Sequence, residues 1–247
     1  GLDRIRRNVD ATGVLEGTDR FQQQAFDVVL GGVASAFDLS DEDPRTVERF
    51  DTAHLTRFEE WKDKNNKNHY KANSQSLGKL LLLARRLCEN GCNFVTVTTS
   101  FVWDMHADVN NLGMERGMDY VGSPFNHSVS ALIEDIEARG LQDDILVVCT
   151  GEMGRTPKIN DRGGRDHWGN LTPLLLYGAG IPRGQVIGHS TSDGGEPQST
   201  PVTSPNLIST IMHTLVDVPE LRLRVDVPRE LMSVIGDHRP IDGLDLD

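Results

Sequence analysis

Two residues near the middle of the chain could bind a metal ion together. Asp104 and His106 lie two positions apart, after a run of β-forming residues. In an extended backbone, residues i and i+2 point to the same side, so the carboxylate and the imidazole can meet on one cation. An oxygen donor beside a nitrogen donor suits zinc or a similar divalent metal. The spacing leaves a second interpretation open, in which the two residues form a surface pair in a loop.

More candidate ligands follow further along the chain. His167 could supply a second nitrogen, and Glu152 or Asp166 could supply another oxygen. Imidazole and carboxylate ligands together favour zinc, with Mg, Ca or Mn as alternatives. We therefore predict a divalent metal site, with zinc as the preferred ion, formed by Asp104, His106, His167, Glu152 and Asp166.

The segment that leads to His167 has a local excess of positive charge in an otherwise acidic chain. Four basic side chains fall within eleven positions: Arg155, Lys158, Arg162 and Arg165. Arginine suits bidentate contact with phosphate or sulfate oxygens. We expect Arg155, Arg165 and Lys158 to face an anionic substrate group. The alternative is a solvated loop in which the arginines pair with Asp161 and Asp166.

A side chain that could act as a catalytic nucleophile is not evident in the sequence. The chain has no Gly-x-Ser-x-Gly motif, so an α/β-hydrolase mechanism would have no nucleophile. Cys88 lies on an apolar helix face and Cys149 in a continuous apolar run, so both are predicted to be core residues. The catalytic residue is therefore left unassigned.

The chain around these residues alternates between predicted helices and strands. Apolar residues at helical spacing predict helices over 19–37, 77–88, 128–139 and 204–215. β-rich or continuous apolar runs predict strands over 93–100, 144–150 and 172–177. The polar segment 61–76 is interpreted as a loop. This alternation favours an α/β sheet covered by helices on both faces, with sites at the C-terminal ends of its strands.

Several helix ends carry recognisable signals. Gly91 and Gly140 are predicted to end the helices over 77–88 and 128–139. Ser204 is predicted to cap the last helix, with Pro205 at its first position. The buried stripe of that helix is predicted to consist of Ile208, Ile211, Met212 and Leu215.

Composition narrows the class of protein. The 247 residues include 37 acidic and 25 basic side chains, a net charge of −12. Nucleic-acid binding and attraction to anionic membranes are disfavoured, because both need clustered Lys and Arg. The longest apolar run, 80–84, is too short to insert into a membrane. Three cysteines do not make a disulfide framework. No composition break divides the chain, so we expect a single domain over 1–247.

The motifs together resemble a known family. The string Gly-Glu-Met-Gly-Arg-Thr-Pro-Lys-Ile-Asn over 151–160, followed by Gly-Arg-Asp-His-Trp over 164–168, is similar to the signature of the bacterial domain-of-unknown-function family 1501. That family is a branch of the alkaline phosphatase/sulfatase superfamily. The segments 82–87, 94–97 and 103–106 resemble its middle section. The resemblance extends from about residue 19 to the C-terminus.

The resemblance implies a fold and a chemistry. The fold is a three-layer α/β/α arrangement with a largely parallel central sheet, like that of alkaline phosphatase. The chemistry is metal-dependent hydrolysis of phosphate or sulfate esters, with a small anionic ester as substrate. By motif position, Asp104 and His106 resemble the Asp/His pair of one metal site, and His167 the histidine that completes it. Glu152 stands where many relatives have an Asp-His pair that usually serves the other metal.

Two departures from the superfamily pattern keep other functions open. Met153 follows Glu152, so the histidine of the usual pair is absent. The superfamily's nucleophile and a neighbouring metal-binding Asp come from an N-terminal section, which we expect this chain to lack. A non-catalytic metal-binding or structural protein is therefore the first alternative, and a phosphoryl-transfer mutase relative the second. A missing first strand would also favour self-association into a homo-oligomer. Relatives often carry an export signal, which suggests a periplasmic location by resemblance alone.

Overall fold

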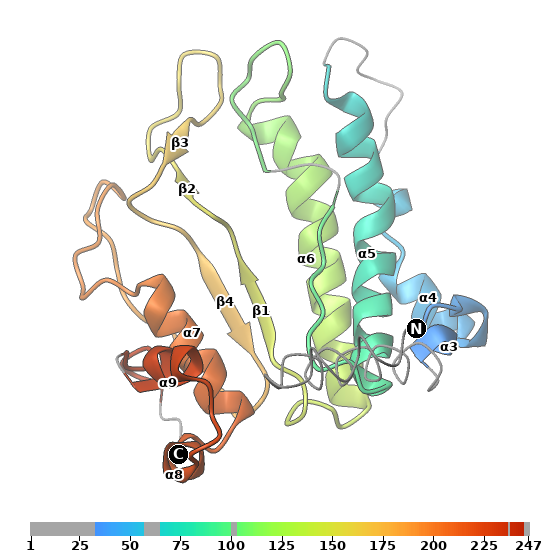
Figure 1. The fold of residues 1–247 in the computed structure, drawn as a ribbon. Coiled ribbons are helices and arrows are strands. Elements are labelled where there is room, and N and C mark those ends of the chain that lie inside the picture. Colours follow the sequence, from blue (N-terminus) through green and yellow to red (C-terminus); the bar gives the residue numbers. More distant parts are fainter. Residues whose placement is uncertain (1–32, 57–64, 100–102, 237, 245–247) are drawn as a thin grey trace, which may run out of the picture.

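Two long helices form the centre of the molecule. In the computed structural model, α5 (Lys67–Glu89) and α6 (Met114–Ala138) pack side by side (Figure 1). The structure describes residues 33–56, 65–99, 103–236 and 238–244. The short elements that precede α5 are α3 (Val33–Ala36), η2 (Leu39–Asp41), α4 (Pro44–Phe50) and η3 (Ala53–Leu55).

The two long helices run in the same direction. Asn73, near the start of α5, donates to the carbonyl of Tyr120, near the start of α6, at 3.3 Å. Arg85, near the end of α5, contacts Asp135, near the end of α6. The chain therefore has to return between the helices, and it does so through a segment that includes residues 94–99 (Figure 1).

A proline inside α6 explains the contact from Asn73. Pro124 has no N–H, so the carbonyl of Tyr120, four residues earlier, has no helical donor. Asn73 is buried and supplies the missing hydrogen bond from α5. An unpaired carbonyl in this core would cost about 1–3 kcal/mol. The proline and the asparagine therefore fix how α5 and α6 lie against each other.

The described strands pair in a two-stranded arm, residues 147–177, which lies beside α6 (Figure 1). β1 (Val147–Thr150) pairs with β4 (Leu174–Tyr177), and β2 (Gly154–Arg155) pairs with β3 (His167–Trp168). The strands predicted over 144–150 and 172–177 are confirmed over β1 and β4, whereas residues 144–146 and 172–173 are not assigned to a strand. Both pairings are antiparallel. Within the described ranges no strands pair in parallel, so the α/β/α fold with a parallel central sheet stays a prediction.

The predicted strand over 93–100 was wrong for the part that the structure describes. Residues 93–99 are not assigned to a strand, and Ser100 lies outside the described residues. The side chain of Phe94 is 81% exposed. β-branched residues favour an extended backbone, but a strand also needs a neighbour for its N–H and C=O groups. Strand propensity indicates an extended backbone, but it does not show whether a neighbouring strand is present.

The helix ends were predicted better than the helix starts. α5 and α6 end where Gly91 and Gly140 were expected to stop them, and both glycines have positive φ angles. The segment 61–76 was interpreted as a loop, yet α5 begins at Lys67; residues 61–64 lie outside the described residues. The N-terminal turns of α5 bury Tyr70, Asn73 and Ser74, a mixed face that apolar spacing does not reveal. α6 likewise begins 14 residues before the predicted start.

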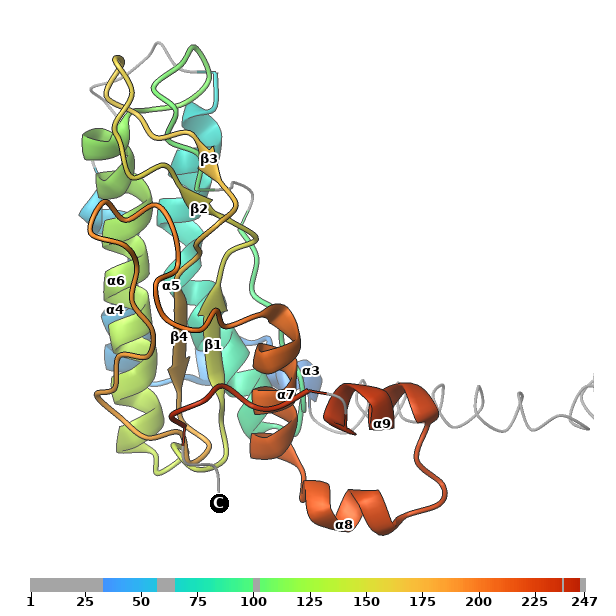
Figure 2. The same cartoon turned by 90° about the vertical axis from the view of Figure 1, so that its left-hand side faces the viewer.

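The C-terminal helices lie on the side of the arm away from α5, as Figures 1 and 2 show. They are α7 (Ser204–Leu215), α8 (Val218–Leu223) and α9 (Arg229–Gly236). The predicted cap of α7 was one residue late, because Thr203 and Asn206 form the capping box.

The predicted apolar stripe of α7 was wrong for two of its four residues, since Ile211 and Met212 are half-buried. Ile208 and Leu215 are 45% and 51% exposed, whereas Ser209 and Thr210 are buried. The two hydroxyls bond the C-terminal segment: Ser209 donates to the carbonyl of His238, and Thr210 accepts from the N–H of Ile241. These hydrogen bonds orient Ser209 and Thr210 of α7 towards the C-terminal segment, and apolar periodicity does not indicate them.

The helix predicted over 19–37 is described only from residue 33 onward, where α3 lies.

Two apolar clusters hold the helices together. The first lies at the start of α5 and α6 and contains Tyr70, Met105, Leu112, Tyr120 and Val121. The second contains Phe50, Leu82, Ala131, Leu132 and Ile136, and Val147 and Tyr177 of the arm pack against it. The first cluster supports the loop that follows residue 103, and the second anchors the arm. No helix within the described ranges is long and apolar enough to span a membrane.

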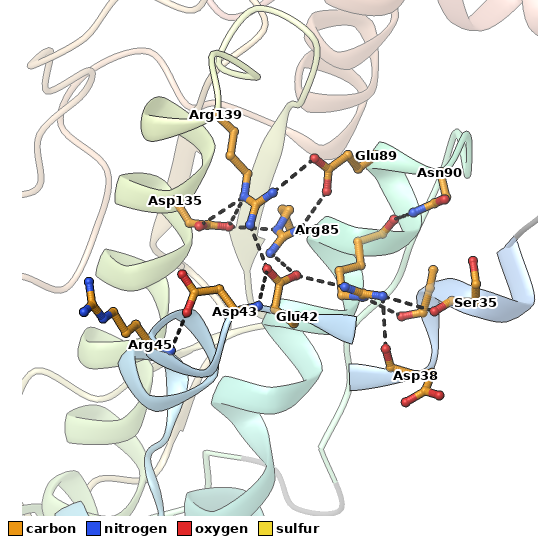
Figure 3. A network of polar contacts seen from close by, with 12 residues as sticks. Ser35, Asp38, Glu42, Asp43, Arg45, Arg85, Glu89, Asn90, Asp135 and Arg139 are labelled. Carbon is orange, nitrogen blue, oxygen red and sulfur yellow. Dashed lines mark hydrogen bonds and ion pairs between the residues drawn. The ribbon is translucent and has the colours of Figure 1, made fainter. Parts of the chain in front are cut away.

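A network of ion pairs joins the ends of α5 and α6 to η2 (Figure 3). The side chain of Arg85 is 1% exposed and contacts three carboxylates, at 2.7 Å from Glu42, 2.6 Å from Glu89 and 2.8 Å from Asp135. Arg139 contacts the same three acidic residues from the surface side. Each buried charge therefore has charged partners, which a buried ion needs.

Candidate metal centre

The loop after residue 103 is held in place by a buried tyrosine. Tyr70 donates its hydroxyl to the carbonyl of Asp104 at 2.9 Å and accepts from the N–H of Leu112 at 3.2 Å. Burial raises the pKa of Tyr70 to about 12, although the hydrogen bond from Leu112 acts in the opposite direction. The hydroxyl therefore stays protonated at neutral pH and remains a donor. Tyr70 fixes the backbone that carries Asp104.

The arm supplies the other half of the site. Arg155 of β2 lies directly opposite His167 of β3 in the antiparallel register. Residues that face each other in this way have side chains on the same side of the ladder. Gly154, next to Arg155, has no room for a side chain, because a Cβ there would lie 1.9 Å from the carbonyl oxygen of Leu171. This tight approach holds the arm in the register that aims Arg155 and His167 together.

Three donor atoms meet between the loop and the arm. Nε2 of His106 lies 2.6 Å from Oδ1 of Asp104 and 3.1 Å from Nε2 of His167, and the latter nitrogen is 3.3 Å from the same Oδ1. The structure brings Asp104 and His106, which were predicted to meet on one cation, into contact, and His167 joins them. The side chains are 21%, 18% and 56% exposed, respectively, so the cluster is open to solvent.

The arrangement of these atoms suits a cation. A carboxylate oxygen and the unprotonated nitrogens of two imidazole rings can each offer a lone pair to a cation. A tetrahedral zinc ion with bonds of about 2.0–2.2 Å separates its ligand atoms by roughly 3.3–3.5 Å. The two distances that involve His167 are close to that value, and the contact between His106 and Asp104 is shorter. The donor set therefore fits a small divalent metal.

Asp166 lies on the far side of the His106 ring. Its Oδ1 is 2.9 Å from Nδ1 of His106, so it does not point at the converging donor atoms. The hydrogen bond with His106 is the main reason why the pKa of Asp166 is lowered from its ordinary value. A carboxylate that accepts from Nδ1 leaves Nε2 free for a metal, an arrangement common around metal-binding histidines. The structure therefore gives Asp166 a supporting place, where the sequence predicted a direct ligand.

Glu152 is not among the grouped residues. Its side chain is exposed, in the bend between β1 and β2, and the cluster of described residues with metal-compatible spacing contains Asp104, His106 and His167 only. Of the five predicted ligands, the structure thus brings three together and places a fourth behind one of them.

The three residues predicted to bind an anion, Arg155, Arg165 and Lys158, do not lie together in the structure. A terminal guanidinium nitrogen of Arg155 lies 2.7 Å from Oδ1 of Asp104 and 3.4 Å from Nε2 of His106, so this arginine borders the donor cluster. Arg165 instead donates to the carbonyl of Thr156, within the segment that connects β2 to β3. Lys158 is exposed. Arg155 is therefore the best placed of the three to contact an anion next to a bound cation.

Comparison with family models gives one match along almost the whole chain. Residues 3–242 match the model described as Protein of unknown function (DUF1501). The chain belongs to the DUF1501 family. Searches of curated proteins and of solved structures gave no match. The predicted membership of this family is confirmed, whereas the wider relationship to alkaline phosphatases and sulfatases stays a prediction from the motifs.

Two residues that support the site in this DUF1501 chain were missed in the sequence. Tyr70 was placed in a predicted loop, and nothing in its neighbourhood indicated a bond to Asp104, 34 positions away. Gly164 belongs to the family motif, but its role needs the structure: a Cβ there would lie 2.3–2.6 Å from backbone atoms of Met105 and His106. Glycine lets the hairpin loop touch the backbone that carries His106.

Proposed function

We propose that this chain is a metal-dependent hydrolase of phosphate or sulfate esters that binds one divalent cation, preferably zinc, through Asp104, His106 and His167. The convergence of these three donor atoms at the junction of the loop and the arm carries the proposal. Two histidines and one carboxylate form a ligand set found in catalytic zinc sites, which keep a coordination position open, whereas structural sites use four protein ligands.

Arg155 supports the choice of an anionic ester. The guanidinium has five N–H donors, and the contact with Asp104 occupies one nitrogen. A guanidinium whose other donors are not engaged by Asp104 can hold phosphate or sulfate oxygens in a bidentate manner. Its side chain is 20% exposed, so an incoming anion can reach it.

The residues then have distinct roles. Asp104, His106 and His167 hold the cation, and Arg155 orients the anionic group and balances its charge. When bound, the divalent cation supplies Lewis acidity, which polarises an ester and lowers the pKa of water. The exposure of His167 leaves one side of the cluster accessible to substrate.

The first test is metal binding. Zinc content after reloading, measured by mass spectrometry, is expected to be about one ion per chain. Asp104→Ala and His167→Ala are each expected to abolish it, because both remove a ligand. His189→Ala is the matched control, since His189 is exposed and lies outside the cluster. Stoichiometric zinc in both ligand variants would contradict the site.

The second test is hydrolysis by the zinc-loaded protein. p-Nitrophenyl phosphate and p-nitrophenyl sulfate are the probes, and Arg155→Gln is expected to reduce kcat/KM by at least about tenfold while zinc is retained. Stoichiometric zinc without hydrolysis of either ester would contradict the hydrolase and favour the non-catalytic metal-binding alternative. Turnover by one ester and not the other would identify the substrate class.

A further inference from the structure

An asparagine at the tip of the arm connects several parts of the site. Asn160 accepts, through Oδ1, from the backbone N–H groups of Arg162 and Gly164, both at 3.0 Å. Through Nδ2 it donates to the carbonyl of His106 at 3.2 Å and to Oδ1 of Asp166 at 3.3 Å. The amide group thus makes four hydrogen bonds, which is its full capacity.

The two halves of this amide do different things. The oxygen shapes the turn that leads to Gly164. The NH₂ group reaches the backbone of His106 and the carboxylate that faces the ring of His106. That carboxylate, on Asp166, lies 2.9 Å from Nδ1 of the ring. The backbone and the ring of His106 are therefore both tied to one side chain.

This double attachment determines which ring nitrogen faces the cation site. An ionised carboxylate can only accept, so Nδ1 of His106 carries the hydrogen of that bond. Nε2 is then directed at Asp104 and His167, at 2.6 and 3.1 Å. A ring free to rotate about its side-chain bonds would lose this arrangement.

We propose that Asn160 is a positioning residue of the metal centre, which holds Asp166 and the backbone of His106 so that Nδ1 donates to Asp166 and Nε2 faces the cation. The part that concerns the cation rests on the proposed function. The hydrogen bond from Nδ1 does not, and it can be measured with or without metal.

Asn160→Asp separates the two halves of the amide. An aspartate keeps an oxygen that can accept from Arg162 and Gly164, so the turn retains its support. It lacks the NH₂ group and places a second negative charge beside Asp166. Asn170→Asp is the matched control: Asn170 is on the same arm and donates to the carboxylate of Glu196, but it does not contact the donor cluster.

The readout is the hydrogen-bonded Nδ1–H proton of His106 in the NMR spectrum of protein with ¹⁵N-labelled histidine, assigned by its loss in His106→Gln. The resonance is expected in the unaltered chain and in Asn170→Asp, and it is expected to disappear or broaden in Asn160→Asp. Zinc affinity should fall about 10- to 100-fold in Asn160→Asp, the usual range for a residue behind a metal ligand. The visible spectrum of the cobalt-loaded protein should change in the same variant.

A second variant keeps the test decisive if Asn160→Asp does not fold. Asp166→Asn retains the size of the side chain but weakens the acceptor, and the same loss of the Nδ1–H resonance is expected. An unchanged resonance, zinc affinity and cobalt spectrum in a folded Asn160→Asp would overturn the inference, as would equal changes in Asn170→Asp. Failure of the unaltered chain to bind zinc would instead overturn the proposed function, and the Nδ1–H resonance would still decide the role of Asn160.

Discussion

Two groups of charged side chains lie at opposite ends of the α5–α6 pair, and they differ in how their charges are balanced. At the C-terminal ends, Arg85 is buried, and its guanidinium group contacts three carboxylates. At the N-terminal ends, the donor atoms of Asp104, His106 and His167 converge, with the guanidinium of Arg155 beside them. The charges of the first group balance one another within a buried network, whereas the second group is partly exposed and presents grouped donor atoms to solvent.

The comparison separates stability from function. A buried arginine with matched carboxylates holds helices together, and its loss leaves buried negative charges balanced only by the more exposed Arg139 and Arg86. A partly exposed cluster of ligand atoms adds little to folding and is suited to binding. We therefore expect substitutions in the first group to lower the free energy of unfolding. Substitutions in the second group are expected to abolish zinc binding with little effect on unfolding.

The largest effect is expected from Arg85→Met. Removal of the arginine leaves Glu42, Glu89 and Asp135 close together without their central cation, which costs about 3–5 kcal/mol of unfolding free energy. Chemical denaturation measures this loss. Arg183→Met is the control, because the pair of Arg183 with Glu137 is largely exposed and is expected to contribute less than about 1 kcal/mol. Equal effects of the two variants would remove the distinction between the two ends.

Acid is expected to weaken the same network. Burial alone would raise the pKa of Glu42, but hydrogen bonds from Arg86 and Arg85 and the charges of Arg85 and Arg139 lower it to about 2. A lowered folded-state pKa gives stability that is present above the ordinary value of 4.5 and is lost as the pH falls towards 2. The full contribution is about 3 kcal/mol. Denaturation midpoints between pH 6 and pH 2 should show this loss, and Glu42→Gln should flatten the profile.

The smallest effect on folding is expected from His167→Ala. Its side chain is 56% exposed, so the free energy of unfolding should change by no more than about 0.5 kcal/mol in the absence of zinc. Zinc at 100 times its dissociation constant should stabilise the unaltered chain by about 2.7 kcal/mol and the variant by nothing. Thermal melts with and without zinc test both statements. A large loss of stability without zinc would show that the cluster also supports the fold.

The grouping of Asp104, His106 and His167 could be predicted from the sequence better than the residues that surround them. Asp104 and His106 are close in the chain, so their contact follows from local backbone geometry. His167 followed from its place in a motif. Tyr70 and Asn160 act over 34 and 54 positions, respectively, and only the fold brings them to the loop.

The strands show the same limit. Continuous apolar runs located β1 and β4 correctly, because burial of side chains is encoded locally. The direction of pairing is not encoded in those runs: the described pairs are antiparallel, and the parallel central sheet stays a prediction. Residues 93–99 have the composition of a strand but do not form one in the structure, because composition alone does not provide a neighbouring strand to pair with.

The bond between Asn73 and the carbonyl freed by Pro124 has an evolutionary consequence. An N–H at position 124 would restore the helical partner of Tyr120 and make the asparagine redundant, whereas loss of the asparagine alone would leave a buried carbonyl unpaired. The asparagine therefore cannot change freely while the proline stays. Across related sequences, the two should therefore be inherited together, as a pair 51 positions apart that records how α5 and α6 are aligned.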